Sequence, residues 1–125
     1  MTRVPSFSLF GAALLVTACS PSKSDDGSSS PPPSSCEGAM THLCERVCAC
    51  NTPGCHWQSG SAGTLGGFTS QKGCTDWFLA NECKSGGTAG FDYGKCSAAV
   101  DSAECAAHPT AGKALRYPKE CPGPP

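Results

Sequence analysis

Cysteine spacing is the strongest constraint on the fold of this chain. Ten of its eleven cysteines lie within the 86 residues from Cys36 to Cys121. A density of about 12% in a short chain is typical of exported domains that are stapled by disulfides. The ten form an even number, as five bridges require, and they are Cys36, Cys44, Cys48, Cys50, Cys55, Cys74, Cys83, Cys96, Cys105 and Cys121. Ten cysteines allow about 945 pairings, so the sequence leaves the connectivity open.

Large apolar side chains are scarce in the same segment. Its aromatic residues are Trp57, Phe68, Trp77, Phe78, Phe91, Tyr93 and Tyr117. A domain of this size rarely stabilises itself by apolar burial alone, whereas each crosslink contributes about 2–4 kcal/mol by constraining the unfolded chain. We therefore expect reduction to unfold the domain. Trp57 beside Cys55 is interpreted as core packing against a disulfide, with ligand stacking as the alternative.

The clearest helix is predicted over residues 37–50. Apolar side chains recur there with the spacing of one buried helical stripe, at Met40, Leu43, Cys44, Val47 and Cys48. Cys48 and Cys50 are two residues apart, which places them about 200° apart around the helix axis. We therefore expect these two cysteines to bond to different partners.

Two further short helices are predicted. One runs from Thr75, a suitable N-cap, to Cys83, and the other runs from Asp92 to Ala107 before Pro109 ends it.

The remaining segments are predicted to be loops. Glycines interrupt residues 56–73, where only a short extended piece is expected, and the tail from Thr110 shows no periodicity. The predicted fold is therefore a small, disulfide-rich, mainly α domain over residues 36–121, with about three short helices, many loops and no sizeable sheet. Residues 122–125 are expected to be a flexible tail.

The N-terminal residues have the parts of an export signal. Arg3 precedes a run of small and apolar residues over Leu9–Ala18, which is shorter than the roughly 20 residues of a membrane span. A basic residue, a short apolar region and small residues before a cleavage site form a secretory signal. Leu15-Val16-Thr17-Ala18-Cys19 resembles the lipobox of bacterial lipoproteins. An ordinary signal peptide with an incidental Cys19 is the alternative.

The resemblance to lipoproteins implies a lipid anchor. Residues 1–18 would be removed, and Cys19 would carry a diacylglycerol group and usually a third acyl chain. Two chains suffice for stable anchoring, because each buried methylene contributes about 0.8 kcal/mol. The mature protein would then bind the membrane through its N-terminal lipid alone. Ser20 resembles the sorting residue of lipoproteins sent to the outer membrane, on its periplasmic or surface face, rather than to the inner membrane.

Residues 19–35 are expected to form the lipidated N-terminus and a disordered tether. From Ser20 onward the segment is mostly Ser, Pro and Gly and has no large apolar residue, so burial cannot offset the entropy of ordering it. Sixteen such residues reach about 20–24 Å, with Pro31–Pro33 stiffening the distal end.

Metal and redox chemistry are the weaker interpretations of the cysteines. A zinc site could be written with six ligands, namely Cys44, Cys48, Cys50, Cys55, His42 and His56. Structural zinc motifs, however, usually pair their cysteines at separated positions. Export favours oxidation to disulfides, so no metal or cofactor is predicted. Cys48 and Cys50 as a redox pair would need an electropositive site, which only Arg46 suggests.

No catalytic residues are predicted, and the chain is not expected to be an enzyme. The carboxylates show no paired motif and suit solvated or capping positions: Glu37, Glu45, Asp76, Asp92, Asp101 and Glu104. His42, His56 and His108 are expected to be solvated or capping. Removal of Arg3 leaves eight of the nine basic residues against ten acidic ones, a net charge of −2. Without a basic cluster, nucleic acid is not an expected partner.

The functional expectation is an interaction or structural module held at the cell envelope, with a protein or glycan partner. The order of Cys48-x-Cys50, Pro53-Gly54-Cys55 and Phe68-Thr69-Ser70 also loosely resembles Kazal-type protease inhibitors, although the gap from Cys55 to Cys74 is too long. That resemblance implies inhibition through Asn51–Gly54. An accessory of an envelope enzyme is a further alternative.

Overall fold

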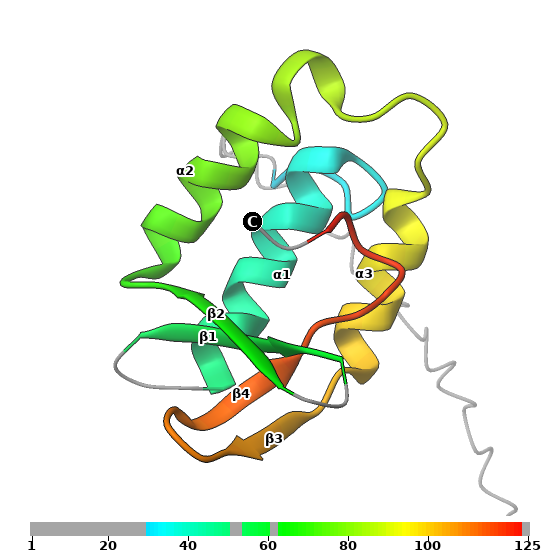
Figure 1. Ribbon diagram of the computed structural model, residues 1–125. Coiled ribbons are helices and arrows are strands. Elements are labelled where there is room, and N and C mark those ends of the chain that lie inside the picture. The colour runs from blue at the N-terminus through cyan, green and yellow to red at the C-terminus, as the bar shows by residue number, and fades with distance from the viewer. Residues whose placement is uncertain (1–29, 51–53, 61–62, 124–125) are drawn as a thin grey trace, which may run out of the picture.

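The computed structural model describes residues 30–50, 54–60 and 63–123 (Figure 1). The predicted signal peptide, Cys19 and most of the tether lie outside these residues. The elements in chain order are α1 (Cys36–Cys50), β1 (Cys55–Ser59), β2 (Thr64–Phe68), α2 (Gln71–Asn81), the short 3-10 helix η1 (Lys84–Gly86), α3 (Tyr93–Ser102), β3 (Cys105–His108) and β4 (Gly112–Arg116).

The prediction of no sizeable sheet is wrong. The four strands form one sheet in the order β2-β1-β4-β3. β1 pairs antiparallel with β2, and β3 pairs antiparallel with β4. The two hairpins join through parallel pairing of Trp57 with Leu115 and of Gln58 with Arg116. Both segments that were expected to be loops, residues 56–73 and the tail from Thr110, therefore contain strands.

Two of the predicted helix boundaries also need correction. α2 begins at Gln71 rather than Thr75, because Ser70 is the N-cap and its Oγ accepts from the Gly73 N–H at 3.1 Å. α3 has the predicted N-cap, Asp92, but ends at Ser102. Of the residues expected to continue it, those from Cys105 to Ala107 instead pair with β4.

The ten cysteines form five disulfides, which confirms the predicted disulfide scaffold. The pairs are Cys36–Cys83, Cys44–Cys74, Cys48–Cys55, Cys50–Cys105 and Cys96–Cys121. Four of them have one cysteine on α1, so this helix is bonded to the region after α2, to α2 itself, to β1 and to β3. Cys48 and Cys50 bond to different partners, as their positions on the helix predicted.

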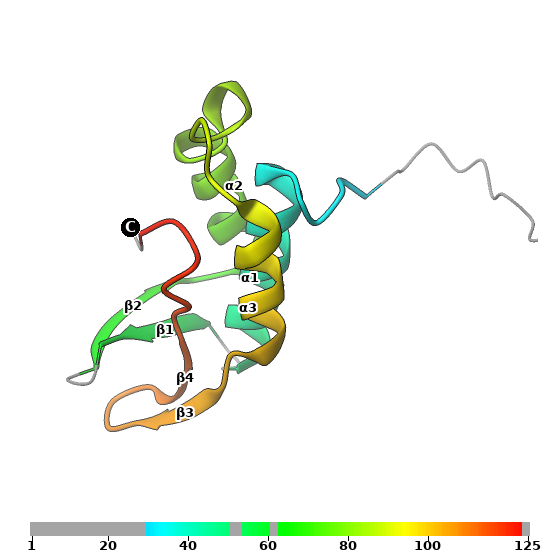
Figure 2. The same cartoon turned by 90° about the vertical axis from the view of Figure 1, so that its right-hand side faces the viewer.

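The apolar core surrounds α1, which lies between α2 and α3 and meets the sheet at its C-terminal end (Figure 1). Most of the predicted stripe is buried, with Met40, Leu43, Cys44 and Val47 each at most 1% exposed, whereas Cys48 is only partly buried. The core is completed by side chains from the other elements, chiefly Phe78, Val100 and Leu115. The helices thus form one layer, and the sheet extends away from one side of that layer (Figure 2).

The chain enters the domain along α1 and α3. Ser97 Oγ on α3 donates to the Pro33 carbonyl at 2.9 Å. The Pro32 carbonyl lies so close to Gly38 that a β-carbon there would collide with it. The described end of the predicted tether therefore packs on the helical layer, opposite the side from which the sheet extends (Figure 2).

Candidate functional site

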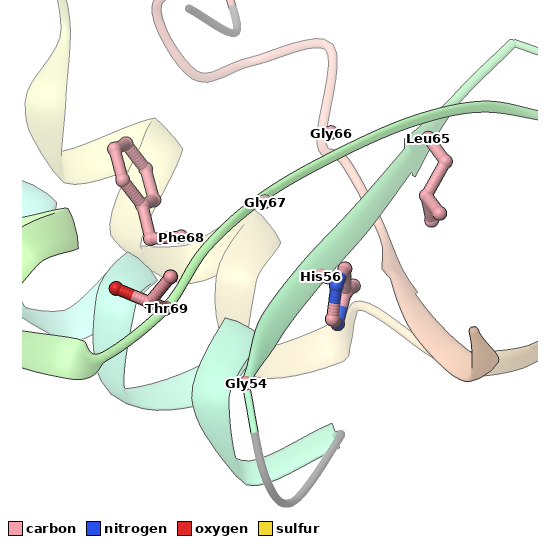
Figure 3. A pocket seen from close by; sticks show the side chains of 7 residues that line it. All are labelled: Gly54, His56, Leu65, Gly66, Gly67, Phe68 and Thr69. Carbon is pink, nitrogen blue, oxygen red and sulfur yellow. The ribbon is translucent and has the colours of Figure 1, made fainter.

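A shallow groove of about 500 Å³ lies over β2, an edge strand of the sheet (Figure 3). Its lining comes from the start of β1, from β2 and from the residue after β2: Gly54, His56, Leu65, Gly66, Gly67, Phe68 and Thr69. His56 and Leu65 lie on one side of the β2 backbone, and Phe68 lies on the other (Figure 3). The groove therefore runs across a strand whose middle has no side chains.

The two glycines of β2 shape this groove. Gly66 pairs with Trp57 and Gly67 pairs with His56 on the neighbouring strand. A β-carbon on Gly66 would overlap the Trp57 indole, and one on Gly67 would crowd the His56 ring and the Cys55 carbonyl. The rings of β1 thus occupy the space that side chains on β2 would otherwise fill. The outer surface of β2 is bare backbone as a consequence.

Trp57 belongs to the core, which confirms the interpretation as packing. Its side chain is 4% exposed. Its ring lies with its centroid 5.3 Å from that of Phe68 and 6.1 Å from that of Tyr117. Trp57 therefore supports the groove from beneath and does not line it.

An exposed aromatic side chain lies beside the groove. Phe68, which lines it, is 6.1 Å from Trp77 of α2 between ring centroids. Trp77 is 36% exposed. Among the residues that the structure describes, it is the large apolar residue that is exposed to solvent. Apolar surface thus continues from Phe68 of the groove to Trp77 of α2, and contiguous surface of this kind marks binding sites.

The lining of the groove carries little charge. His56 is the one ionisable side chain among the seven lining residues, and Thr69 adds a hydroxyl. Such a surface suits contacts to backbone and apolar groups, whereas a charged ligand would find no charged side chain of opposite sign in this lining.

A second, more polar depression lies between α1, α3 and residues 30–33. His42 Nε2 is 2.7 Å from Asp101 Oδ1, and His42 Nδ1 is 3.9 Å from Glu45 Oε2. The Asp101 side chain is 70% exposed. The pair therefore stabilises the contact between the two helices by roughly 1 kcal/mol or less. The Ser97 hydroxyl in the same depression donates to Pro33, not to His42. We therefore assign these contacts a structural role.

The other polar residues singled out from the sequence are spread over the domain. Asp92 caps α3, Asp76 pairs with Lys72, and Glu104 pairs with Arg116 at 3.8 Å. His108 Nε2 contacts the Gly63 carbonyl at 3.1 Å. Across the described ranges, no three His, Cys, Asp or Glu side chains are arranged to hold a metal ion.

The groove itself was missed in the sequence. The sequence pattern predicts loop at Gly66 and a short extended piece only from Gly67 to Ser70, although Leu65 and Phe68 have the apolar character of a strand. The inhibitor interpretation places binding on Asn51–Gly54, and the structure describes only Gly54 of this segment.

Among the residues that the structure describes, no helix has the length and apolarity needed to cross a membrane. No family model, curated protein or solved structure matches the chain.

Proposed function

We propose that this chain is a lipid-anchored protein of the bacterial cell envelope whose disulfide-stapled domain binds a partner at the groove over β2. The anchor is proposed from the lipobox-like sequence ending at Cys19, and the outer membrane from Ser20. Five disulfides support export, since such bridges persist in oxidising compartments.

The observation that carries the binding role is the bare edge strand beside an exposed tryptophan. Exposed sheet edges bind extended chains through main-chain hydrogen bonds, and neighbouring side chains provide selectivity. Both neighbours of this edge strand are crosslinked to the core helix, β1 to α1 through Cys48–Cys55 and α2 to α1 through Cys44–Cys74. A preorganised surface loses little entropy when a partner binds.

The position of the groove agrees with an N-terminal anchor. Residues 30–35 lead into the helical layer, and the sheet extends from the opposite side of the domain (Figure 2). A lipid ahead of residue 30, joined to the domain through the expected flexible tether, would therefore leave the groove accessible to a partner.

Intact-mass spectrometry of the detergent-extracted full chain tests the anchor. The expected mass is that of residues 19–125 with five disulfides and two or three acyl chains. A Cys19→Ala variant should remain as an uncleaved precursor. A wild-type protein that is processed without acylation would contradict the anchor.

A photoreactive benzoylphenylalanine tests the groove in cells. At Thr69, which lines the groove, irradiation should give a covalent adduct of defined mass. At Ala107, an exposed residue of β3 away from the groove, it should give none. Absence of any adduct at Thr69 would contradict the binding role. The inhibitor alternative gains no support from the residues that are described, so we retain a single candidate.

A further inference from the structure

We infer that the partner at this groove is a second copy of the chain, whose β2 pairs antiparallel with this β2 to continue the sheet. The inference rests on the proposed function, because it names the occupant of the proposed binding site. The two copies would be related by a two-fold axis at Gly66, the middle residue of the strand.

The two edges of the sheet differ in how they are protected against pairing. Natural proteins blunt an edge strand with charges, proline or very short length. β3, at one edge, has four residues and is followed by Pro109, and His108 at its end is tied to Gly63. β2, at the other edge, has the sequence Thr-Leu-Gly-Gly-Phe, with neither charge nor proline. In Figure 3 its backbone at Gly66 and Gly67 lies in front of β1, and Gly67 is exposed. β2 is therefore the edge suited to accept another strand.

The sequence of β2 complements itself in one antiparallel register. Centring the pair on Gly66 places Leu65 of each copy opposite Gly67 of the other, and Thr64 opposite Phe68. Leu65 and Gly67 lie on the same face as His56, because side chains alternate along a strand and His56 pairs with Gly67. A leucine from the second copy can thus reach over the bare Gly67 to the His56 ring.

The same register brings the two leucines together. Each Leu65 has the other Leu65 as its diagonal neighbour across the axis, at about 7–8 Å between Cα atoms. Because β2 carries no charge, the two-fold axis creates no like-charge repulsion within the paired strands. The groove would be filled from both sides by one apolar side chain of each copy.

The size of the contact explains why an anchor matters. A strand of five residues buries less than the roughly 800 Å² per partner of a stable interface, so the pairing is weak between free molecules. Confinement to a membrane raises the effective concentration of the two copies and favours pairing without any new contact.

The test uses the acylated full chain, purified and placed in phosphatidylethanolamine–phosphatidylglycerol vesicles, with benzoylphenylalanine at Thr69. Irradiation should give a product of twice the chain mass. Leu65→Lys and Leu65→Asp should each reduce its yield by roughly tenfold, because like charges then meet across the axis. A one-to-one mixture of the two variants should restore it, and Ala107→Lys, at an exposed position of β3 away from the groove, should leave it unchanged. Leu65 lies outside the buried core, and Thr64→Lys at an exposed position provides a second disrupting variant.

The outcomes separate this inference from the proposed function. If the wild-type chain gives no dimer in vesicles but Thr69 still forms an adduct with another protein in cells, the second copy is overturned and the binding role stands. If a dimer forms but the mixed variants do not restore it, the register on Gly66 is overturned. If Thr69 forms no adduct in either setting, both are overturned.

Discussion

The Trp57 indole lies directly against the backbone of Gly66, its partner on the neighbouring strand. The ring occupies the place where a side chain of residue 66 would begin, and it continues into contacts with Phe68 and Tyr117. This relationship joins the core to the groove, because the buried indole is the reason that the outer strand must be bare at residue 66. Packing of the Trp57 ring beneath the strand thus requires glycine at this position of the exposed edge.

Gly66→Ala should destabilise the domain by about 1–3 kcal/mol, the usual cost of forcing extra atoms into a packed core. The variant should lower the midpoint of urea unfolding followed by tryptophan fluorescence. Gly123→Ala is the matched control, because nothing lies within 4 Å of a β-carbon at that position, and it should change stability by about 0.5 kcal/mol or less. Equal midpoints for the two variants would show that Trp57 does not pack on Gly66.

Helical periodicity was the most reliable sequence signal. The stripe from Met40 to Val47 predicted α1 and its buried face, because a helix with one apolar face needs no distant partner to be recognised. The angular separation of Cys48 and Cys50 likewise predicted different bonding partners. Both inferences depend on local geometry, which the sequence contains.

The strands depended on contacts that are distant in sequence. Gly66 and Gly67 are poor strand formers by themselves, and they occupy β2 because rings of β1 fill the space beside them. Residues after Ser102 have helical character, but Cys105 is bonded to Cys50, 55 residues earlier in the chain, and β3 pairs with β4. No pattern within these segments reports such partners, so the sheet and the groove could not be predicted from them.

Tyr93→Phe should loosen the segment between α2 and α3. The Tyr93 hydroxyl donates to Glu82 Oε1 at 2.7 Å and accepts from the Thr88 N–H at 2.8 Å. Removing the hydroxyl takes away the donor to Glu82 and leaves the Thr88 N–H without its acceptor. The free energy of unfolding should fall by about 1–2 kcal/mol. The variant should also speed amide exchange at Thr88. Thr88→Val, which removes only the exposed contact of its hydroxyl to Glu82 at 3.2 Å, should cost less. Unchanged exchange in Tyr93→Phe would contradict this assignment.

Asp92 should make stability depend on pH in acid. The hydrogen bond from the Lys95 backbone N–H lowers the pKa of the Asp92 carboxyl below its ordinary value of 3.8, with burial opposing this and the Lys95 side chain adding to it. A lowered pKa in the folded state means that the contribution is present above the ordinary value and disappears as pH falls through the folded value. Asp92→Asn keeps a capping side chain that does not titrate.

The measurement is the melting temperature between pH 7 and pH 2. The wild-type chain should lose melting temperature relative to Asp92→Asn as the pH falls below about 4. Glu120→Gln removes a carboxylate from an exposed turn and serves as the control. Parallel curves for wild type and Asp92→Asn would rule out a role of this cap in acid stability.

The bridge between Cys50 and Cys105 should be the first to open under limiting reductant. Thiol–disulfide exchange requires that a thiolate reach one sulfur of the bridge. Cys105 is exposed on β3, whereas both cysteines of the Cys44–Cys74 bridge are fully buried. Alkylation after partial reduction, followed by peptide mapping, should therefore label Cys50 and Cys105 before any other pair. Early label at Cys44 and Cys74 would mean that the domain unfolds before it is reduced, which would contradict a ranking of the bridges by access in the folded state.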